Sequence, residues 1–178
     1  MTGGGRVAVI MLLSVIWLSG CSGSKAKVSG SFNTQKEYEA IYVVPFDTTL
    51  VPPEIGEPVF NEFVDRLNDQ RRKTRVAKFM ILKEELKEVE PAWLIKQTYI
   101  SGDIWGYVES SGCCSTEMKV KSRLYLYEPG MAEPSVEVSM QENDFFEHDR
   151  LPVSTGKERM GKKLARALAD AIILKLSP

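Results

Sequence analysis

The sequence predicts an α+β domain with two layers, in which helices pack on a mostly antiparallel sheet. Three consecutive segments after residue 98 alternate apolar and polar residues with a period of two, which is typical of an antiparallel meander. Two other segments, 58–72 and 157–176, carry apolar residues at helical spacing. In chain order we expect β-α-β-α-β-β-β-α.

The first half of the domain supplies two strands and two helices. Residues 39–46 form a nearly continuous apolar run, typical of a buried strand. Pro58 suits the first position of a helix, so we expect a helix from Pro58 to about Arg72. Residues 76–82 predict a second strand, and residues 83–89 a short charged helix. The glutamates around it have the pattern of a solvated face: Glu84, Glu85, Glu88 and Glu90.

The three alternating segments predict strands at 99–109, 117–127 and 135–141. Their apolar faces carry Ile100, Gly102, Ile104, Gly106 and Val108, then Met118, Val120, Ser122, Leu124 and Leu126, then Val136, Val138 and Met140. The opposite face gathers aromatic and basic side chains, namely Tyr99, Trp105, Tyr107, Lys119, Lys121, Arg123, Tyr125 and Tyr127. Asp103 shares that face, where we expect it to pair with a cross-strand Lys or Arg.

An irregular polar stretch and a long closing helix complete the domain. We expect residues 143–152 to be irregular and residues 157–176 to be helical. The core-facing row of this helix is Met160, Leu164, Leu168, Ile172 and Leu176, with Ala167 and Ala171 beside it.

The amino terminus has the pattern of an export signal. Arg6 precedes an uncharged run over residues 7–17, too short to span a bilayer at about 20 residues but within the roughly 7–15 of a secretory signal. The run leads into Leu18-Ser19-Gly20-Cys21, which resembles the lipobox of bacterial lipoproteins. The alternative is an ordinary signal peptide, or a buried helix, with a chance cysteine.

The lipobox resemblance implies cleavage before Cys21, a diacylglycerol thioether on its sulfur and a further acyl chain on the new amine. Each buried methylene contributes about 0.8 kcal/mol, so several chains anchor firmly to a membrane. Ser22 stands where an aspartate would favour retention at the inner membrane. By resemblance to proteobacterial lipoproteins, this implies the periplasmic side of the outer membrane.

These features divide the chain into a signal peptide (1–20), a lipidated cysteine with a flexible tether (21–36) and a single α+β domain (37–178). The tether is poor in large apolar residues and rich in Ser, Gly and Lys. The formal net charge of the whole chain is −1, which gives no indication of nucleic-acid binding.

The remaining cysteines, Cys113 and Cys114, are adjacent. A disulfide ordinarily needs Cα atoms at least ~4.4 Å apart, whereas neighbours across a trans peptide lie ~3.8 Å apart. A strained vicinal disulfide, a cross-link to another chain and free thiols in a loop all stay open. His148 is the only histidine, so a Cys–Cys–His metal site lacks ligands. We expect no metal and no cofactor.

The sequence favours a binding module over an enzyme. No Walker A loop, GxGxxG, HExxH or GxSxG occurs, and any Ser-His-Asp or Cys-His arrangement would need His148, which we expect in a surface loop. The aromatic and basic face predicts docking of an envelope protein or of a second copy. Alternatively, its cross-strand pairs only stiffen the sheet, or a helix covers it. A carrier of a small apolar or lipid ligand is the second functional hypothesis, and a hydrolase using His148 the third.

Two short motifs resemble a known exported group. Val43-Val44-Pro45-Phe46, Ser101-Gly102-Asp103 and the element order over residues 38–176 resemble the TolB amino-terminal type of domain, shared with the CsgG and LpoB lipoprotein families. The Asn/Gly-rich loop that often follows Pro-Phe in this group is replaced by DTTLVPPEIGEP, and the middle helical region is shorter. The resemblance implies a non-catalytic envelope module that docks onto other proteins, and it carries over no ligand residues.

Overall fold

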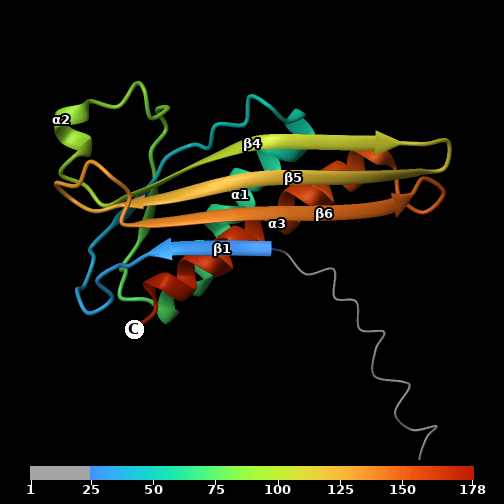
Figure 1. Ribbon diagram of the computed structural model, residues 1–178. Coiled ribbons are helices and arrows are strands. Elements are labelled where there is room, and N and C mark those ends of the chain that lie inside the picture. The colour runs from blue at the N-terminus through green and yellow to red at the C-terminus, as the bar shows by residue number, and fades with distance from the viewer. Residues whose placement is uncertain (1–24) are drawn as a thin grey trace, which may run out of the picture.

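A computed structural model describes residues 25–178, and residues 1–24, including Cys21, lie outside the described residues. It confirms the predicted α+β architecture, with the two long helices covering one face of a six-stranded mixed sheet (Figure 1). The strands are β1 (Lys25–Gly30), β2 (Ile41–Val43), β3 (Phe79–Ile81), β4 (Tyr99–Ser111), β5 (Ser115–Tyr127) and β6 (Val136–Glu147). The α-helices are α1 (Pro53–Gln70), α2 (Pro91–Leu94) and α3 (Val153–Leu176), and a 3-10 turn, Arg71–Lys73, extends α1.

The strand order is β1-β6-β5-β4-β2-β3. Strands β4, β5 and β6 form the predicted antiparallel meander, and β1 adds antiparallel to β6. Strand β2 runs parallel to both β3 and β4, because helix α1 carries the chain back over the sheet between β2 and β3. The two sheet edges are therefore β1 and β3.

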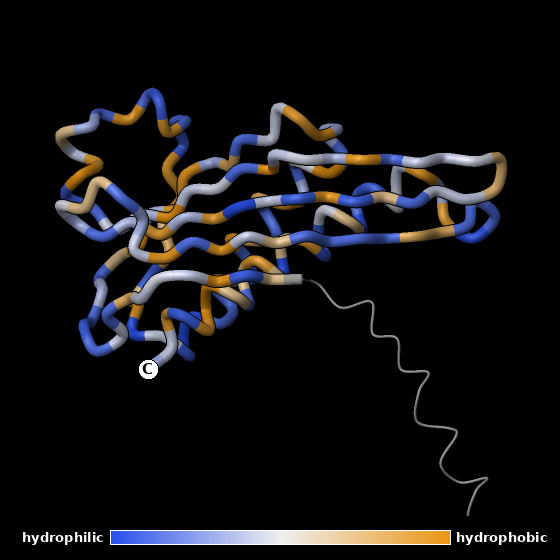
Figure 2. Tube along the Cα trace, viewed as in Figure 1, coloured by the Kyte–Doolittle hydropathy of each residue, from blue (hydrophilic) through white to orange (hydrophobic). Residues whose placement is uncertain are grey.

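The hydrophobic core lies between the sheet and the pair α1 and α3, which also pack on each other. The predicted row of α3 is buried throughout, and so are the residues predicted for the apolar faces of β5 and β6, from Met118 to Leu126 and from Val136 to Met140. Figure 2 shows how hydrophobic and hydrophilic residues alternate along these strands, as burial of one sheet face requires. Among the described residues, no helix combines the length and the apolar character that crossing a membrane demands.

Helix α1 begins at Pro53 rather than at the predicted Pro58, which lies inside the helix. Pro53 also suits a first helical position, and the amides of Ile55 and Gly56 bond to the carbonyl of Pro52. Ile55 and Gly56 are buried. Packing of this first turn therefore offsets the backbone hydrogen bond that Pro58 cannot donate.

The predicted charged helix at 83–89 is wrong, because residues 86–88 form a turn and the short helix α2 comes only at Pro91. All of Glu84, Glu85, Glu88 and Glu90 are exposed. A short charged segment without an apolar stripe gains too little from packing to offset the cost of starting a helix.

Two segments expected to be irregular are strands. Residues 143–147, predicted to be loop, continue β6, since the long strand β5 supplies partners from Lys119↔Asn143 to Ser115↔Glu147. Residues 25–30, predicted to belong to the flexible tether, form β1 and pair with β6 from Lys25↔Gln141 to Gly30↔Val136. Backbone pairing stabilises both segments, and their polar composition does not reveal it.

Candidate functional site: the outer face of the sheet

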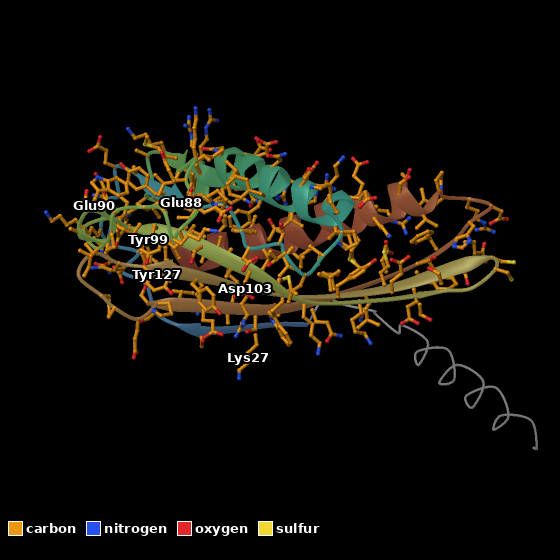
Figure 3. The ribbon with its side chains drawn as sticks, turned by 90° about the horizontal axis from the view of Figure 1, so that it is seen from above. Lys27, Glu88, Glu90, Tyr99, Asp103 and Tyr127 are labelled. Atoms are coloured by element: carbon orange, nitrogen blue, oxygen red, sulfur yellow. The ribbon has the colours of Figure 1, made fainter. Side chains whose placement is uncertain are left out.

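The outer face is the sheet surface turned away from α1 and α3. In Figure 3 the helices lie on one side of the sheet and Lys27 projects from the other. The strand register lines up side chains of this face in rungs across the sheet, such as Tyr99 opposite Tyr127 and Asp103 opposite Arg123. Helix α2 lies against the β2 side of this face, where Trp93 packs on Tyr42 beside Tyr99. Trp105 and Val108, farther along β4, stay exposed.

A β-bulge at Trp105 divides the outer face. The register of β4 against β5 shifts between Ile104 and Gly106, so the alternation of inward and outward side chains reverses beyond this point. Tyr107 lies opposite the buried Val120 and packs against the core. Its predicted place on the aromatic and basic face is therefore wrong. Val108, predicted to be apolar-facing, is 62% exposed on the outer face.

The bulge also moves Gly106 to the outer face, opposite Lys121, contrary to its predicted place on the apolar face. The other predicted residues do share the outer face, namely Tyr99, Trp105, Lys119, Lys121, Arg123, Tyr125 and Tyr127. Seven side chains of the predicted set are thus brought together, and Tyr107 is not.

Trp105 is the centre of a cation–π cluster. The residue is 44% exposed, and Lys121 Nζ lies 5.1 Å and the Arg123 guanidinium carbon 5.5 Å from the ring centroid. Both separations lie in the range in which a cation is attracted to an indole face. Arg123 Nε also lies 3.4 Å from Asp103 Oδ1, and Tyr125 donates to Asp103 Oδ2 at 3.3 Å. The expected pairing of Asp103 with a cross-strand cation is confirmed.

Three tyrosines form the other part of the outer face. The rings of Tyr99 and Tyr127 stack with centroids 4.6 Å apart and 11° between their planes, and Tyr125 leans on Tyr127 at 6.5 Å. Partial burial raises the pKa of all three phenols, and the nearby Asp103 carboxylate adds to the rise for Tyr125. These phenols therefore stay neutral hydrogen-bonding groups at any physiological pH.

Exposed apolar side chains add to the outer face beyond the bulge. Phe145 of β6 lies opposite Glu117 and is 60% exposed, one outward rung beyond the pair of Val108 and Lys119. Our sequence analysis missed both residues. Phe145 continues the outward alternation of β6, and the isolated Gly106 within a strand pattern was an available signal for a bulge.

A hydrogen-bonded chain of polar groups lies near the β4–β5 hairpin. Tyr107 donates to Glu109, and Lys157 Nζ lies 3.0 Å from the same carboxylate. The hydrogen bond from Tyr107 first, and then those from Lys157 and Ser111, hold the pKa of Glu109 below its ordinary value. Burial raises the pKa of Tyr107, and its hydrogen bond to Glu109 raises it further.

These hydrogen-bonded groups do not follow the sequence of acid, histidine and nucleophile that a hydrolase needs. Ser111 Oγ bonds to Glu109 at 3.0 Å and to Thr116 Oγ1 at 2.9 Å, and Thr116 Oγ1 lies 2.8 Å from His148 Nε2. In a catalytic triad the histidine lies between the acid and the nucleophile. Here the hydroxyls lie between the acid and the histidine, and Thr116 is fully buried. The arrangement is suited to bracing the hairpin.

Cys113 and Cys114 lie in the hairpin turn as exposed free thiols, with their Sγ atoms 2.9 Å apart. The hydrogen bond with Cys113 raises the pKa of the Cys114 thiol. Within residues 25–178 no three His, Cys, Asp or Glu side chains come together as a metal site. The lipidation of Cys21 stays a prediction, because this residue lies outside the described part of the chain.

Comparison with solved structures identifies related folds. No family model matches the chain, and no curated protein matches it. A dodecamer of a PelC variant from Paraburkholderia phytofirmans superimposes with a TM-score of 0.54 at 14% identity, covering 86% of this chain and 99% of that one. A second PelC dodecamer from the same organism gives 0.50 at 14% identity, with 83% and 98% covered.

A third match, lipoprotein GNA1162 from Neisseria meningitidis, has 10% identity and covers 76% of this chain and 96% of that one. Its TM-score of 0.41 is too low to support an inference. The likeness to PelC, over nearly the whole length of both chains, shows that the two share a fold.

Proposed function

We propose that this protein is a non-catalytic, lipid-anchored docking module of the bacterial cell envelope, held on the periplasmic side of the outer membrane through Cys21. The observation that carries the proposal is the outer face, where partly exposed aromatic and basic side chains gather on the meander of β4, β5 and β6. The lipobox supports the anchor, and the fold shared with PelC and the TolB/CsgG/LpoB-like motifs support the envelope setting. In this function the lipid fixes one end of the protein and the sheet presents its outer face.

The tyrosine half of the outer face, which comprises Tyr99, Tyr125 and Tyr127, fits a protein partner. Tyrosines are enriched at binding hot spots because they offer a large apolar area with a polar tip and few rotamers to immobilise. Stacking of Tyr99 on Tyr127 already fixes two of the rings, which lowers the ordering cost of binding.

Site-specific photocrosslinking tests this docking role. A benzoylphenylalanine at Tyr125, installed in intact cells, should give a defined crosslinked product, whereas the same probe at the exposed Asn61 of α1 should not. With the probe kept at Tyr125, the double variant Tyr99→Ser with Tyr127→Ser should lose this crosslinked product with its circular dichroism spectrum intact. Equal crosslinking from Asn61, or unfolding of the double variant, would favour a stiffening role for these side chains.

A second copy of the chain is a further candidate partner. PelC forms dodecamers in both crystal forms. Within residues 25–178, β1 and β3 are the edge strands of the sheet, and another copy could pair with either of them. We expect native mass spectrometry of the lipidated protein in detergent to give a closed oligomer. A monomer at all concentrations would remove self-assembly from the proposal.

The anchor is tested directly by metabolic labelling. A fatty-acid probe should label the wild type and not Cys21→Ser, and the label should fractionate with the outer membrane. Failure to label the wild type would overturn the proposed function.

The carrier hypothesis finds no support in the packing. The side chains between the sheet and the helices, such as Ile41, Phe63, Leu124 and Leu164, are buried without exposure and fill that layer. The described hollows lie on the surface, as along the charged side of α3, where Arg159 and Asp144 meet.

A further inference from the structure

The outer face has a second half with a different chemistry. We call it the basic half, and it comprises Lys27, Trp105, Val108, Lys119, Lys121, Arg123 and Phe145. Trp105, Val108 and Phe145 are 44%, 62% and 60% exposed. Three large apolar side chains are thus exposed to water on one face of the sheet, and apolar side chains that gather on one surface mark interaction sites.

The cations of the basic half are largely free to bind something else. Among the ion pairs of residues 25–178, none involves Lys27, Lys119 or Lys121. The acids within or beside this half are Asp103, which pairs with Arg123, Glu117, which lies opposite Phe145, and Glu137, which accepts from Ser139 next to Lys27. Four cations against three carboxylates leave this surface positive by one charge, on a chain whose net charge is −1.

The first described residue, Lys25, lies close to the basic half. The position of Lys25 therefore restricts which partner this surface can contact. Lys25 pairs with Gln141, which pairs with Lys121, so the start of β1 belongs to the rung that carries Lys121. With strands about 4.8 Å apart, the Cα atoms of Lys25 and Lys121 lie about 10 Å apart. Figure 1 shows that β1 begins halfway along the sheet, level with this half.

Cys21 precedes Lys25 by four residues. At about 3.5 Å per extended residue, they span at most about 14 Å. This inference rests on the proposed lipidation of Cys21. If acyl chains begin there, the bilayer surface must come within about 14 Å of the Lys25 Cα, a distance comparable to the width of the basic half.

We propose that the basic half is a membrane-contact surface, which rests on the anionic headgroups of the bilayer that holds the acyl chains of Cys21. Trp105, Val108 and Phe145 reach the headgroup level, where amphipathic and apolar side chains are favourable. Lys27, Lys119 and Lys121 bind the lipid phosphates of this anionic surface. The tyrosine half then stays clear of the membrane for a protein partner, and the β-bulge at Trp105 separates the two surfaces.

Tryptophan fluorescence tests the proposal, because the mature chain holds only Trp93 and Trp105. The variant Trp93→Phe leaves Trp105 as the single reporter. The variant Trp105→Phe leaves Trp93, in α2 at the far end of the sheet, as the matched control. The lipidated proteins are reconstituted into phosphatidylethanolamine/phosphatidylglycerol vesicles that carry brominated acyl chains, which quench only tryptophans at the membrane. Trp105 should lose most of its emission, and Trp93 should lose little.

The contribution of the lysines is tested by the double variant Lys119→Ala with Lys121→Ala. This variant should reduce the quenching of Trp105, and the remaining quenching should depend less on the phosphatidylglycerol content of the vesicles. The control pair is Lys83→Ala with Lys96→Ala, exposed lysines outside the basic half and without ion pairs in the described chain, and it should change neither. Equal effects of the two pairs would overturn the assignment of the lipid contact to this half.

The outcomes separate this inference from the proposed function. Co-flotation with vesicles together with an unquenched Trp105 overturns the membrane contact and leaves the anchor standing. If Trp105 then crosslinks to an envelope protein, the basic half is part of the protein-docking surface instead. Equal flotation of wild type and Cys21→Ser, or no flotation, overturns the anchor itself and this inference with it.

Discussion

The reversal of faces at the Trp105 bulge can be tested with two neighbouring residues. Tyr107→Ser and Val108→Ser each replace a large side chain by the same small polar one, on opposite faces of β4. A regular strand, as the sequence alternation predicts, would bury Val108 and expose Tyr107. The bulge instead partly buries Tyr107 and exposes Val108. Tyr107→Ser should therefore destabilise the protein more than Val108→Ser does.

The magnitude follows from the packing of Tyr107. A buried tyrosine covers about 150–250 Å², so a half-buried one covers about 100 Å², worth about 2.5 kcal/mol at about 25 cal/mol per Å². Loss of its hydrogen bond to Glu109, in a partly solvated setting, adds about 0.5 kcal/mol. Tyr107→Ser should therefore cost about 3 kcal/mol. Val108 is 62% exposed, so Val108→Ser should cost under about 1 kcal/mol, mostly in strand preference.

Thermal unfolding followed by circular dichroism measures both. At about 2–4 °C per kcal/mol for a domain of this size, Tyr107→Ser should lower the Tm by about 6–12 °C and Val108→Ser by under about 4 °C. Urea unfolding at constant m-value gives the same comparison as free energies. Equal losses, or a larger loss for Val108→Ser, would refute the bulge and restore Tyr107 to the outer face.

Three further predictions concern the helix layer and its ion pairs. At Gly161 an added Cβ would lie 2.6 Å from the Ile55 carbonyl oxygen, a backbone atom that cannot move aside alone. Overpacking there should cost about 2–3 kcal/mol, and the gain in helix preference is about 1 kcal/mol, so Gly161→Ala should lower the free energy of unfolding in urea by about 1–2 kcal/mol. An unchanged or raised midpoint would show that α1 and α3 can separate freely. The lowered pKa of Glu109 stabilises the fold fully above about pH 5 and progressively less as the pH falls. Glu109→Gln should therefore show a smaller drop in Tm between about pH 5 and pH 3 than the wild type, and an identical pH profile would contradict this. Glu142 is 1% exposed and pairs with Lys163 at 2.9 Å, so Lys163→Met should cost about 2–4 kcal/mol by stranding the carboxylate. Adding Glu142→Gln should recover part of that loss, and additive losses would argue against the pair.

Much of the fold follows from local periodicity. The alternation of Met118, Val120, Leu124 and Leu126 and the helical row from Met160 to Leu176 each specify an element and its buried face, because one-sided burial imposes the period. Both are buried as expected. The lipobox reading of Cys21 also needs only local sequence, and it stays a prediction because that residue lies outside the described chain.

The failures share a physical cause. Residues 25–30 form a strand because they hydrogen-bond to β6, and residues 143–147 because they hydrogen-bond to β5. The composition of these segments does not indicate that such a partner strand is present. The helix predicted at 83–89 is absent because no core surface receives it. In each case the deciding energy comes from a partner distant in the chain.

The sequence by itself determined the α+β class, the meander, the closing helix and the chemistry of the outward side chains. Periods of two and 3.6 residues can be recognised within each segment, without knowledge of its partners in the fold. Only the tertiary structure decided which of those side chains share a surface. One extra residue at the Trp105 bulge moved Tyr107 inward and Val108 outward, because the register of β4 is set by its pairing with β5 and not by its own alternation.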